Sequence, residues 1–168
     1  MHDKSTGPAE TASTPSPGQD EPSSAPRVGK RSGFRTRVGY QAVLWEEGHA
    51  IMELALVEGH MNSNGSAHGG VTMTIADAAM GHAATWCPVS GNVRYCATIS
   101  LNTSFLQGPR EGDVIRAEAR LVSVDNRVAT CEAEVRDQSG TVLAVAQGSF
   151  RYARGSEHLD GVARVTRR

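Results

Sequence analysis

The sequence is poor in the residues that mark several common classes of protein. It has only three cysteines, Cys87, Cys96 and Cys131, an odd number at spacings that fit neither a disulfide framework nor a zinc site. Its six histidines form no HxH or HExxH pair. We therefore expect no bound metal, and we interpret the cysteines as small apolar residues of the interior.

Long apolar runs and an excess of charge are also missing. No apolar run approaches the roughly 18 residues of a membrane span, and the start MHDKSTGPAE lacks the apolar region of a secretory signal. The formal net charge is −1 and the sequence pI is about 6.6, so nucleic acid and anionic membranes attract the chain only weakly. We expect a cytoplasmic protein whose partners include neither nucleic acid nor membrane.

The composition divides the chain of 168 residues into three parts. Residues 1–33 contain no aromatic residue and much Ser, Thr, Pro and Gly, so they cannot offset the entropy lost on ordering and are predicted to be a disordered tail. Residues 34–152 carry the apolar patterns of one globular domain. Residues 153–168 are polar and end with basic residues, which indicates a frayed tail.

The most informative stretch is 62–86, where a glycine-rich segment precedes an apolar helix predicted over 71–85. Asp77 interrupts the apolar pattern of this helix. Because a desolvated, unpaired carboxylate costs several kcal/mol, Asp77 is the first candidate for function. Gly69 and Gly70 stand at the expected helix N-terminus, where free backbone N–H groups stabilise an anion or a developing oxyanion. An ordinary tight turn is the alternative interpretation of this glycine pair.

The spacing of these residues has a consequence for assembly. Gly69 and Asp77 are eight residues apart, which is roughly 12 Å along a helix. An oxyanion donor and a base or nucleophile must both lie about 3 Å from one reacting carbonyl group. One copy of the helix therefore cannot supply both, whereas two antiparallel helices in a two-fold dimer can.

Alternating patterns predict the strands. A hairpin over 40–58 turns at Gly48, and after the helix come strands near 93–106, 114–124, 128–137 and 141–152, joined by short turns. Short connections favour an antiparallel meander. The expected class is α+β, a sheet of five to six strands wrapped around one long central helix.

Two side-chain assignments stay open on pattern alone. Alternation along 93–106 puts Thr98 on the polar face of its strand, away from the helix unless the strand bends there. Met73 and Met80 share the side of the helix that carries Asp77, so they belong either to the core or to the lining of a ligand pocket. His82, five residues after Asp77, is interpreted as helix packing.

The chain resembles a known family at these positions. The motif N-x-x-G-x-x-H-G-G is present as Asn62, Gly65, His68, Gly69 and Gly70, with the acid eight residues after the first of the paired glycines. It is similar to the hot-dog-fold acyl-CoA thioesterases of the phenylacetate-pathway (PaaI-like) group over residues 40–152. The resemblance implies hydrolysis of an acyl-CoA thioester without a cofactor, coenzyme A being part of the substrate, in a homodimer that pairs into a homotetramer.

The resemblance also implies roles for single residues. The Gly69 N–H would polarise the thioester carbonyl group, and Asp77 of the facing subunit would attack the carbonyl carbon or activate a water molecule. Asn62 would position water or the leaving group, His68 would hold the loop by hydrogen bonds, and Thr98 would orient the water used by the acid. Substrate-binding residues would be Gly65, Gly70, Met73 and Met80.

Two other functions remain as alternatives. A hot-dog hydratase or dehydratase would share the fold but use a catalytic histidine, and its usual proline-rich HFPG-type segment is missing here. A non-catalytic acyl-CoA-binding regulator would normally carry a DNA-reading element, which residues 1–33 do not provide. Asn62 and Asn64 also have a plain interpretation as turn residues.

Overall fold

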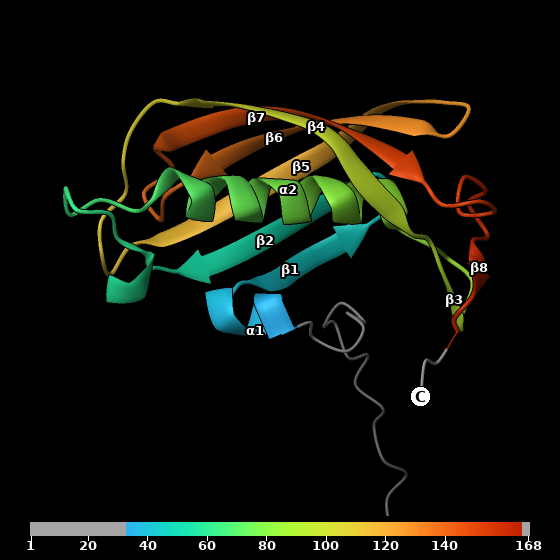
Figure 1. Ribbon diagram of the computed structural model, residues 1–168, viewed down its shortest axis with the longest axis horizontal. Helices are drawn as coiled ribbons and strands as arrows, with labels where there is room; N and C mark the ends of the chain where they lie inside the picture. Colours follow the sequence, from blue (N-terminus) through green and yellow to red (C-terminus); the bar gives the residue numbers. More distant parts are fainter. Residues whose placement is uncertain (1–32, 166–168) are drawn as a thin grey trace, which may run out of the picture.

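The computed structural model of the protein describes residues 33–165, in which an antiparallel sheet curls around one helix (Figure 1). The predicted disordered tail therefore lies outside the described residues, apart from Gly33. In chain order the elements are α1 (Gly33–Val38), β1 (Gln41–Glu46), β2 (His49–Ala55), the 3-10 turn η1 (Glu58–His60), α2 (Gly69–Thr85), β3 (Asn92–Val93), β4 (Cys96–Phe105), β5 (Val114–Asp125), β6 (Val128–Arg136), β7 (Val142–Tyr152) and β8 (Val162–Ala163).

The central helix α2 is the expected one, begun two residues earlier at Gly69. His68 caps it through a side-chain nitrogen, and its end at Thr85 precedes Pro88, which helices do not readily pass. Only one side of α2 packs against the sheet. That side consists of Thr72, Ile75, Ala76, Ala79, Met80, Ala83 and Ala84, all buried. The small alanines let the helix approach the strands closely.

The six-stranded sheet has the order β1-β2-β5-β6-β7-β4, and every pair in it is antiparallel. The expected fold class and the central helix are confirmed, but the simple meander is wrong at one place. β4 lies beside β7 and not beside β5. The segment between β4 and β5 crosses near the start of α2, where the Ala67 N–H donates to the Pro109 carbonyl oxygen and the Leu56 N–H to that of Asp113.

β4 is an edge strand with a break in its register. Thr98 is opposite Phe150 and Ser100 is opposite Ser149, so Ile99 is an extra residue in the strand. The bulge reverses the alternation that the sequence predicts. Thr98 and Leu101, three residues apart, therefore border the same hollow beside α2.

The short helix α1 is not foreseen by the sequence pattern. Arg35, only 7% exposed, fixes it by donating from Nε to the Tyr40 carbonyl oxygen at 3.2 Å. The next turn is fixed by His60, which donates from Nε2 to the Val38 carbonyl oxygen at 2.9 Å. Two buried polar side chains thus hold α1 and the start of β1 in place.

The segment after Tyr152 corrects the expectation of a frayed end as far as residue 165. β8 pairs with β3, and Ser156 is fully buried. Arg94 holds this segment, because its guanidinium donates to the carbonyl oxygens of Ser156, Glu157 and Trp86 and lies 4.6 Å from the ring centroid of Tyr152. One side chain therefore ties the segment to the end of α2.

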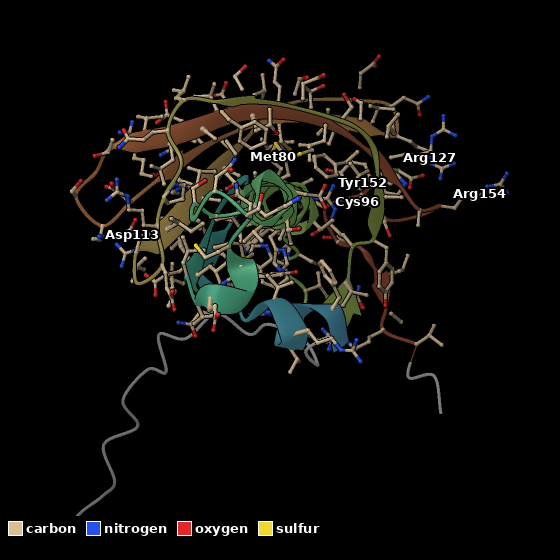
Figure 2. All side chains as sticks on the ribbon, turned by 60° about the vertical axis from the view of Figure 1, so that its left-hand side comes forward. Met80, Cys96, Asp113, Arg127, Tyr152 and Arg154 are labelled. Atoms are coloured by element: carbon tan, nitrogen blue, oxygen red, sulfur yellow. The ribbon has the colours of Figure 1, made fainter. Side chains whose placement is uncertain are left out.

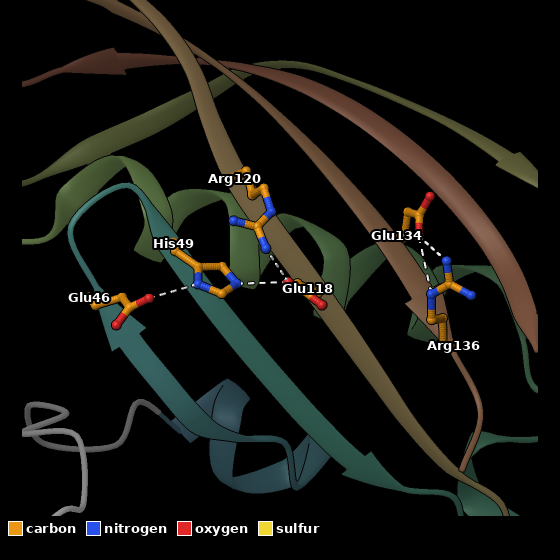
Figure 3. Close-up of polar contacts among 6 residues, drawn as sticks. All are labelled: Glu46, His49, Glu118, Arg120, Glu134 and Arg136. Carbon is orange, nitrogen blue, oxygen red and sulfur yellow. Dashed lines mark hydrogen bonds and ion pairs between the residues drawn. The ribbon is translucent and has the colours of Figure 1, made fainter. Parts of the chain in front are cut away.

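The outer face of the sheet is polar. Figure 3 shows His49 between Glu46 and Glu118, with Arg120 on Glu118 and Arg136 on Glu134. A hollow of about 730 Å³ lies on this face. Both arginines that line it are paired with neighbouring glutamates, Arg120 with Glu118 and Arg136 with Glu134. Among residues 33–165, no helix is both long and apolar enough to span a bilayer.

Candidate active site

A hollow of about 480 Å³ follows the side of α2 that the sheet leaves uncovered. It is bordered by α1, the start of β1, α2, β4 and β7. Its lining residues are Phe34, Tyr40, Met73, Thr74, Asp77, Ala78, Gly81, His82, Cys96, Thr98, Leu101 and Phe150. Asp77 is half-buried in this hollow within the single chain.

Asp77 and Thr98 meet in the hollow, although they are 21 positions apart in the chain. The Thr98 hydroxyl donates to Asp77 Oδ1 at 2.8 Å. The sequence pattern allows Thr98 to face the helix only if the strand bends there. The bulge at Ile99 provides this bend. In the described residues Asp77 Oδ2 has no hydrogen-bond partner, so it keeps its lone pairs for a ligand or a water molecule.

Three further titratable groups border the hollow and are neutral at neutral pH. Burial raises the pKa of the Tyr40 phenol, with Arg35 opposing the shift and Asp77 adding to it. Burial and then Asp77 raise the pKa of the Cys96 thiol to about 11. Burial lowers the pKa of His82, despite its hydrogen bond to the Ala78 carbonyl oxygen. Asp77 is therefore the residue of this hollow suited to carry negative charge.

The contacts of His82 agree with its interpretation as a packing residue, and its side chain also borders the hollow. Its Nδ1 donates to the Ala78 carbonyl oxygen at 2.8 Å, because a carbonyl oxygen can only accept. Trp45 packs edge-on against the imidazole ring, with the centroids 5.2 Å apart, and donates to the His82 carbonyl oxygen. The neutral ring then has Nε2 as an acceptor.

The N-terminus of α2 has one free donor. The Gly70 N–H donates to His68 Nδ1 at 2.9 Å, so His68 has the hydrogen-bonding role expected of it and Gly70 is occupied by the cap. Within residues 33–165 the Gly69 N–H has no partner. The ring of Phe105 lies beside it, 3.2 Å from where a Cβ at residue 69 would stand. A side chain at position 69 would therefore press on the Phe105 ring, which would have to shift by a few tenths of an ångström.

Asn62 uses its side chain inside its own loop. Its Oδ1 accepts from the backbone N–H groups of Asn64 and Ser66, and its Nδ2 donates to the Ser66 hydroxyl. Gly65 has φ of 75°, in the region that favours glycine. These contacts fit the interpretation of Asn62 as a turn residue, and neither residue lines the hollow beside Asp77.

The two methionines have different positions. Met73 lines the hollow one turn before Asp77. Met80 is fully buried, and Figure 2 shows it between α2 and the sheet, where its Cε lies against Gly148. Met80 is a core residue, which removes it from the substrate-binding set.

Several lining residues escape prediction from the sequence. Phe34, Tyr40 and Cys96 reach the hollow from elements distant in the chain. Phe105, outside this hollow, lies against Gly69, and no sequence pattern predicts that contact. Among the described residues no three His, Cys, Asp or Glu side chains gather as metal ligands would.

Comparison with known proteins relates this geometry to a family. A model of the thioesterase superfamily matches residues 64–144, which include α2, Asp77 and Thr98. The chain is similar to this superfamily over just under half of its length. Its similarity to a protein of Halobacterium salinarum named "Putative esterase" is 39% identity over 104 residues, or 56% of this chain and 66% of the relative. The chain spans just under two thirds of the length of the curated relatives that it matches.

Solved structures of the superfamily share the fold. The PaaI protein of Escherichia coli, from the phenylacetic acid degradation operon, has a TM-score of 0.65 with 20% identity over 73% of this chain and 85% of that chain. The smu.793 protein of Streptococcus mutans, solved with acetyl-CoA, has a TM-score of 0.60 with 22% identity over 76% of this chain and 92% of that chain. These similarities confirm the PaaI-like hot-dog fold that the sequence motif indicates.

Proposed function

We propose that the protein is an acyl-CoA thioesterase, which hydrolyses a thioester to a free acid and coenzyme A. The observation that carries the proposal is the pair of Asp77 and Thr98 in a hollow on the open side of α2. Similarity to the thioesterase superfamily over residues 64–144 supports the reaction class. The acetyl-CoA bound to the related S. mutans protein supports coenzyme A thioesters as the substrates.

Asp77 supplies the attacking group. The Thr98 hydroxyl holds Oδ1, and Oδ2 then either takes a proton from a water molecule or attacks the carbonyl carbon itself. In both routes the sulfur leaves as a thiolate, which is a good leaving group because an ordinary thiol has a pKa of about 8.5. In the second route water then hydrolyses the anhydride formed on Asp77, which releases the free acid and restores the carboxylate. The reaction therefore needs no cofactor, and coenzyme A enters as part of the substrate.

The developing oxyanion needs a donor, and the free Gly69 N–H provides it at the positive end of the helix dipole. The cap formed by His68 keeps the first turn of α2 in position. Gly69 and Asp77 belong to one continuous helix, so they remain roughly 12 Å apart along its axis. The donor for a carbonyl group at Asp77 must come from a second copy of the chain.

Two unpaired surfaces support a homodimer. The open side of α2 carries apolar residues such as Met73 and Ala78 that are only partly buried in the described chain. Beside it, β4 is an edge strand, and Ile99 and Phe105 on it are more than half exposed. A two-fold axis near β4 brings two α2 helices side by side and antiparallel. Further pairing into a homotetramer follows from the family resemblance alone.

The experiment that tests the proposal is an assay of thiol release from aryl, short-chain and long-chain acyl-CoA esters. The Asp77→Asn variant keeps the shape of the side chain but cannot act as base or nucleophile, so its turnover should fall by about 10²–10⁴. Its melting temperature should stay near that of the unchanged protein. A variant that folds and retains more than about a tenth of the turnover would refute the role of Asp77.

A further inference from the structure

Gly81 has no structural reason to be a glycine. It lies inside α2, one turn after Asp77, and its φ lies outside the left-handed region that favours glycine. Glycine is the least favourable residue of a helix interior apart from proline. A Cβ added at Gly81 would contact only the Phe150 ring, at 3.8 Å, which is an ordinary van der Waals distance.

Other glycines of the fold have evident structural reasons. A Cβ at Gly148 would come within 2.9 Å of the Phe150 ring and 3.3 Å of Met80, so packing of α2 on the sheet requires that glycine. Gly65 has a positive φ. Gly81 has neither a close contact nor a special backbone conformation, although alanine would fit and would strengthen the helix.

Because Gly81 has no side chain, it leaves space inside the hollow. Gly81 and Phe150 both line it, and Phe150 is 1% exposed, so its ring forms the floor next to Gly81. Phe34 and Tyr40 contribute two further aromatic rings to the lining of the same hollow. α1 and the start of β1, which carry these two rings, are held by the buried contacts of Arg35 and His60.

We propose that Gly81 is a specificity-determining residue, which opens an apolar, ring-lined space for the acyl chain next to Asp77. The inference rests on the proposed thioesterase function. An acyl group whose carbonyl carbon lies at Asp77 and whose chain runs toward the C-terminal end of α2 enters this space. Its length is limited by Phe34 and Tyr40, which lie outside the part of the chain matched by the superfamily model.

The test uses two variants with opposite expected effects. Gly81→Ala adds a methyl group and narrows the space. Phe34→Ala removes a lining ring that is 59% exposed, so it widens the space. Each methylene group excluded from the hollow costs about fourfold in affinity, so Gly81→Ala should weaken the longest accepted chain by about fourfold to tenfold and leave acetyl-CoA nearly unchanged. Phe34→Ala should move the preference toward longer chains.

The measurement is a titration of acetyl-, butyryl-, hexanoyl-, octanoyl- and palmitoyl-CoA by calorimetry. The protein carries Asp77→Asn, so that binding is observed without turnover. Gly59→Ala is the matched control, because Gly59 lies in η1 outside the hollow and its added Cβ would meet no atom within 4 Å. Gly81→Ala should also raise the melting temperature by about 3 °C, because it removes a helix-interior glycine.

The outcomes separate this inference from the proposed function. A chain-length profile that Gly81→Ala leaves unchanged refutes the inference, even if the protein hydrolyses acyl-CoA esters. A lower melting temperature also refutes it, because the glycine would then serve packing. A profile shifted toward shorter chains supports the inference. If Asp77→Asn does not reduce turnover, the result that would refute the proposed mechanism, the same shift is read from kcat/KM for each chain length with Gly81→Ala as the single change.

Discussion

The two sides of α2 consist of similar small and apolar residues but have different surroundings. On the sheet side, Ile75, Ala79 and Met80 are fully buried. On the open side, Met73, Asp77 and Gly81 border a hollow. Side chains fill the space on the sheet side. The open side instead carries the charge of Asp77 and, at Gly81, a position without a side chain. One helix thus combines a packing surface with a surface left open for chemistry.

The sharpest way to break this comparison is to mix two inactive proteins. Asp77→Asn removes the attacking group, and Gly69→Val blocks the approach to the Gly69 N–H. In a mixed dimer one site receives both changes and the other receives neither, so subunit exchange should restore about half of the original activity per heterodimer. The measurement is thiol release before and after exchange.

Exchange itself needs a separate check with differently tagged chains. Because a Cβ at residue 69 would press on the Phe105 ring, the Gly69→Val protein must also be shown to fold by circular dichroism. If verified heterodimers stay as inactive as both parents, Gly69 and Asp77 do not act on one substrate. The open side of α2 would then be a surface without a shared site.

A smaller effect is expected when each side of the helix is truncated. Ile75→Ala should lower the free energy of unfolding by about 2–5 kcal/mol, because it leaves a cavity in the core. Met73→Ala should cost clearly less, since Met73 is only half-buried. Urea unfolding of both variants at equal protein concentration measures the difference. Equal losses would mean that a partner chain buries the open side as fully as the sheet buries the other.

The smallest effect concerns the pH dependence set by His82. Burial lowers the pKa of His82 in the folded chain, so the unfolded chain takes up the proton first. Its contribution to stability is complete above the ordinary histidine value of about 6.5 and is lost as the pH falls through the lowered pKa. The drop in melting temperature between about pH 7.5 and about pH 5.5 should therefore be smaller in His82→Gln. An identical drop in melting temperature in His82→Gln and in the unchanged protein would contradict this role of His82.

The helix and the strands of the main sheet could be predicted because each has a local signal. Alternation marks the strands, and the motif before Asp77 marks the start of α2. The place of β4 could not be predicted, because the segment 106–113 has the composition of a tight turn and only tertiary contacts carry it past the start of α2. α1 and the segment after Tyr152 depend in the same way on the distant contacts of Arg35 and Arg94.

In the candidate site, too, some residues have a local sequence signal and others depend on distant contacts. Asp77 and Gly69 follow from helix periodicity and spacing. The pairing of Thr98 with Asp77 needs the bulge at Ile99, a one-residue insertion that no alternation pattern reveals. Tyr40 and Phe34 come from a segment that β1 and β2 separate from the motif. Their place in the hollow therefore depends on how the whole sheet curls.

The position of β4 also sets the order in which the molecule can be completed. β4 is synthesised before β5, β6 and β7, yet its only neighbour in the sheet is β7, the last of the four. Contacts between distant segments form slowly because a long loop must close first. A chain emerging from the ribosome should therefore hold β4 unpaired until β7 has docked. Thr98 reaches Asp77 only in that final step, so a protein caught before it would have a helix and most of a sheet but no assembled site.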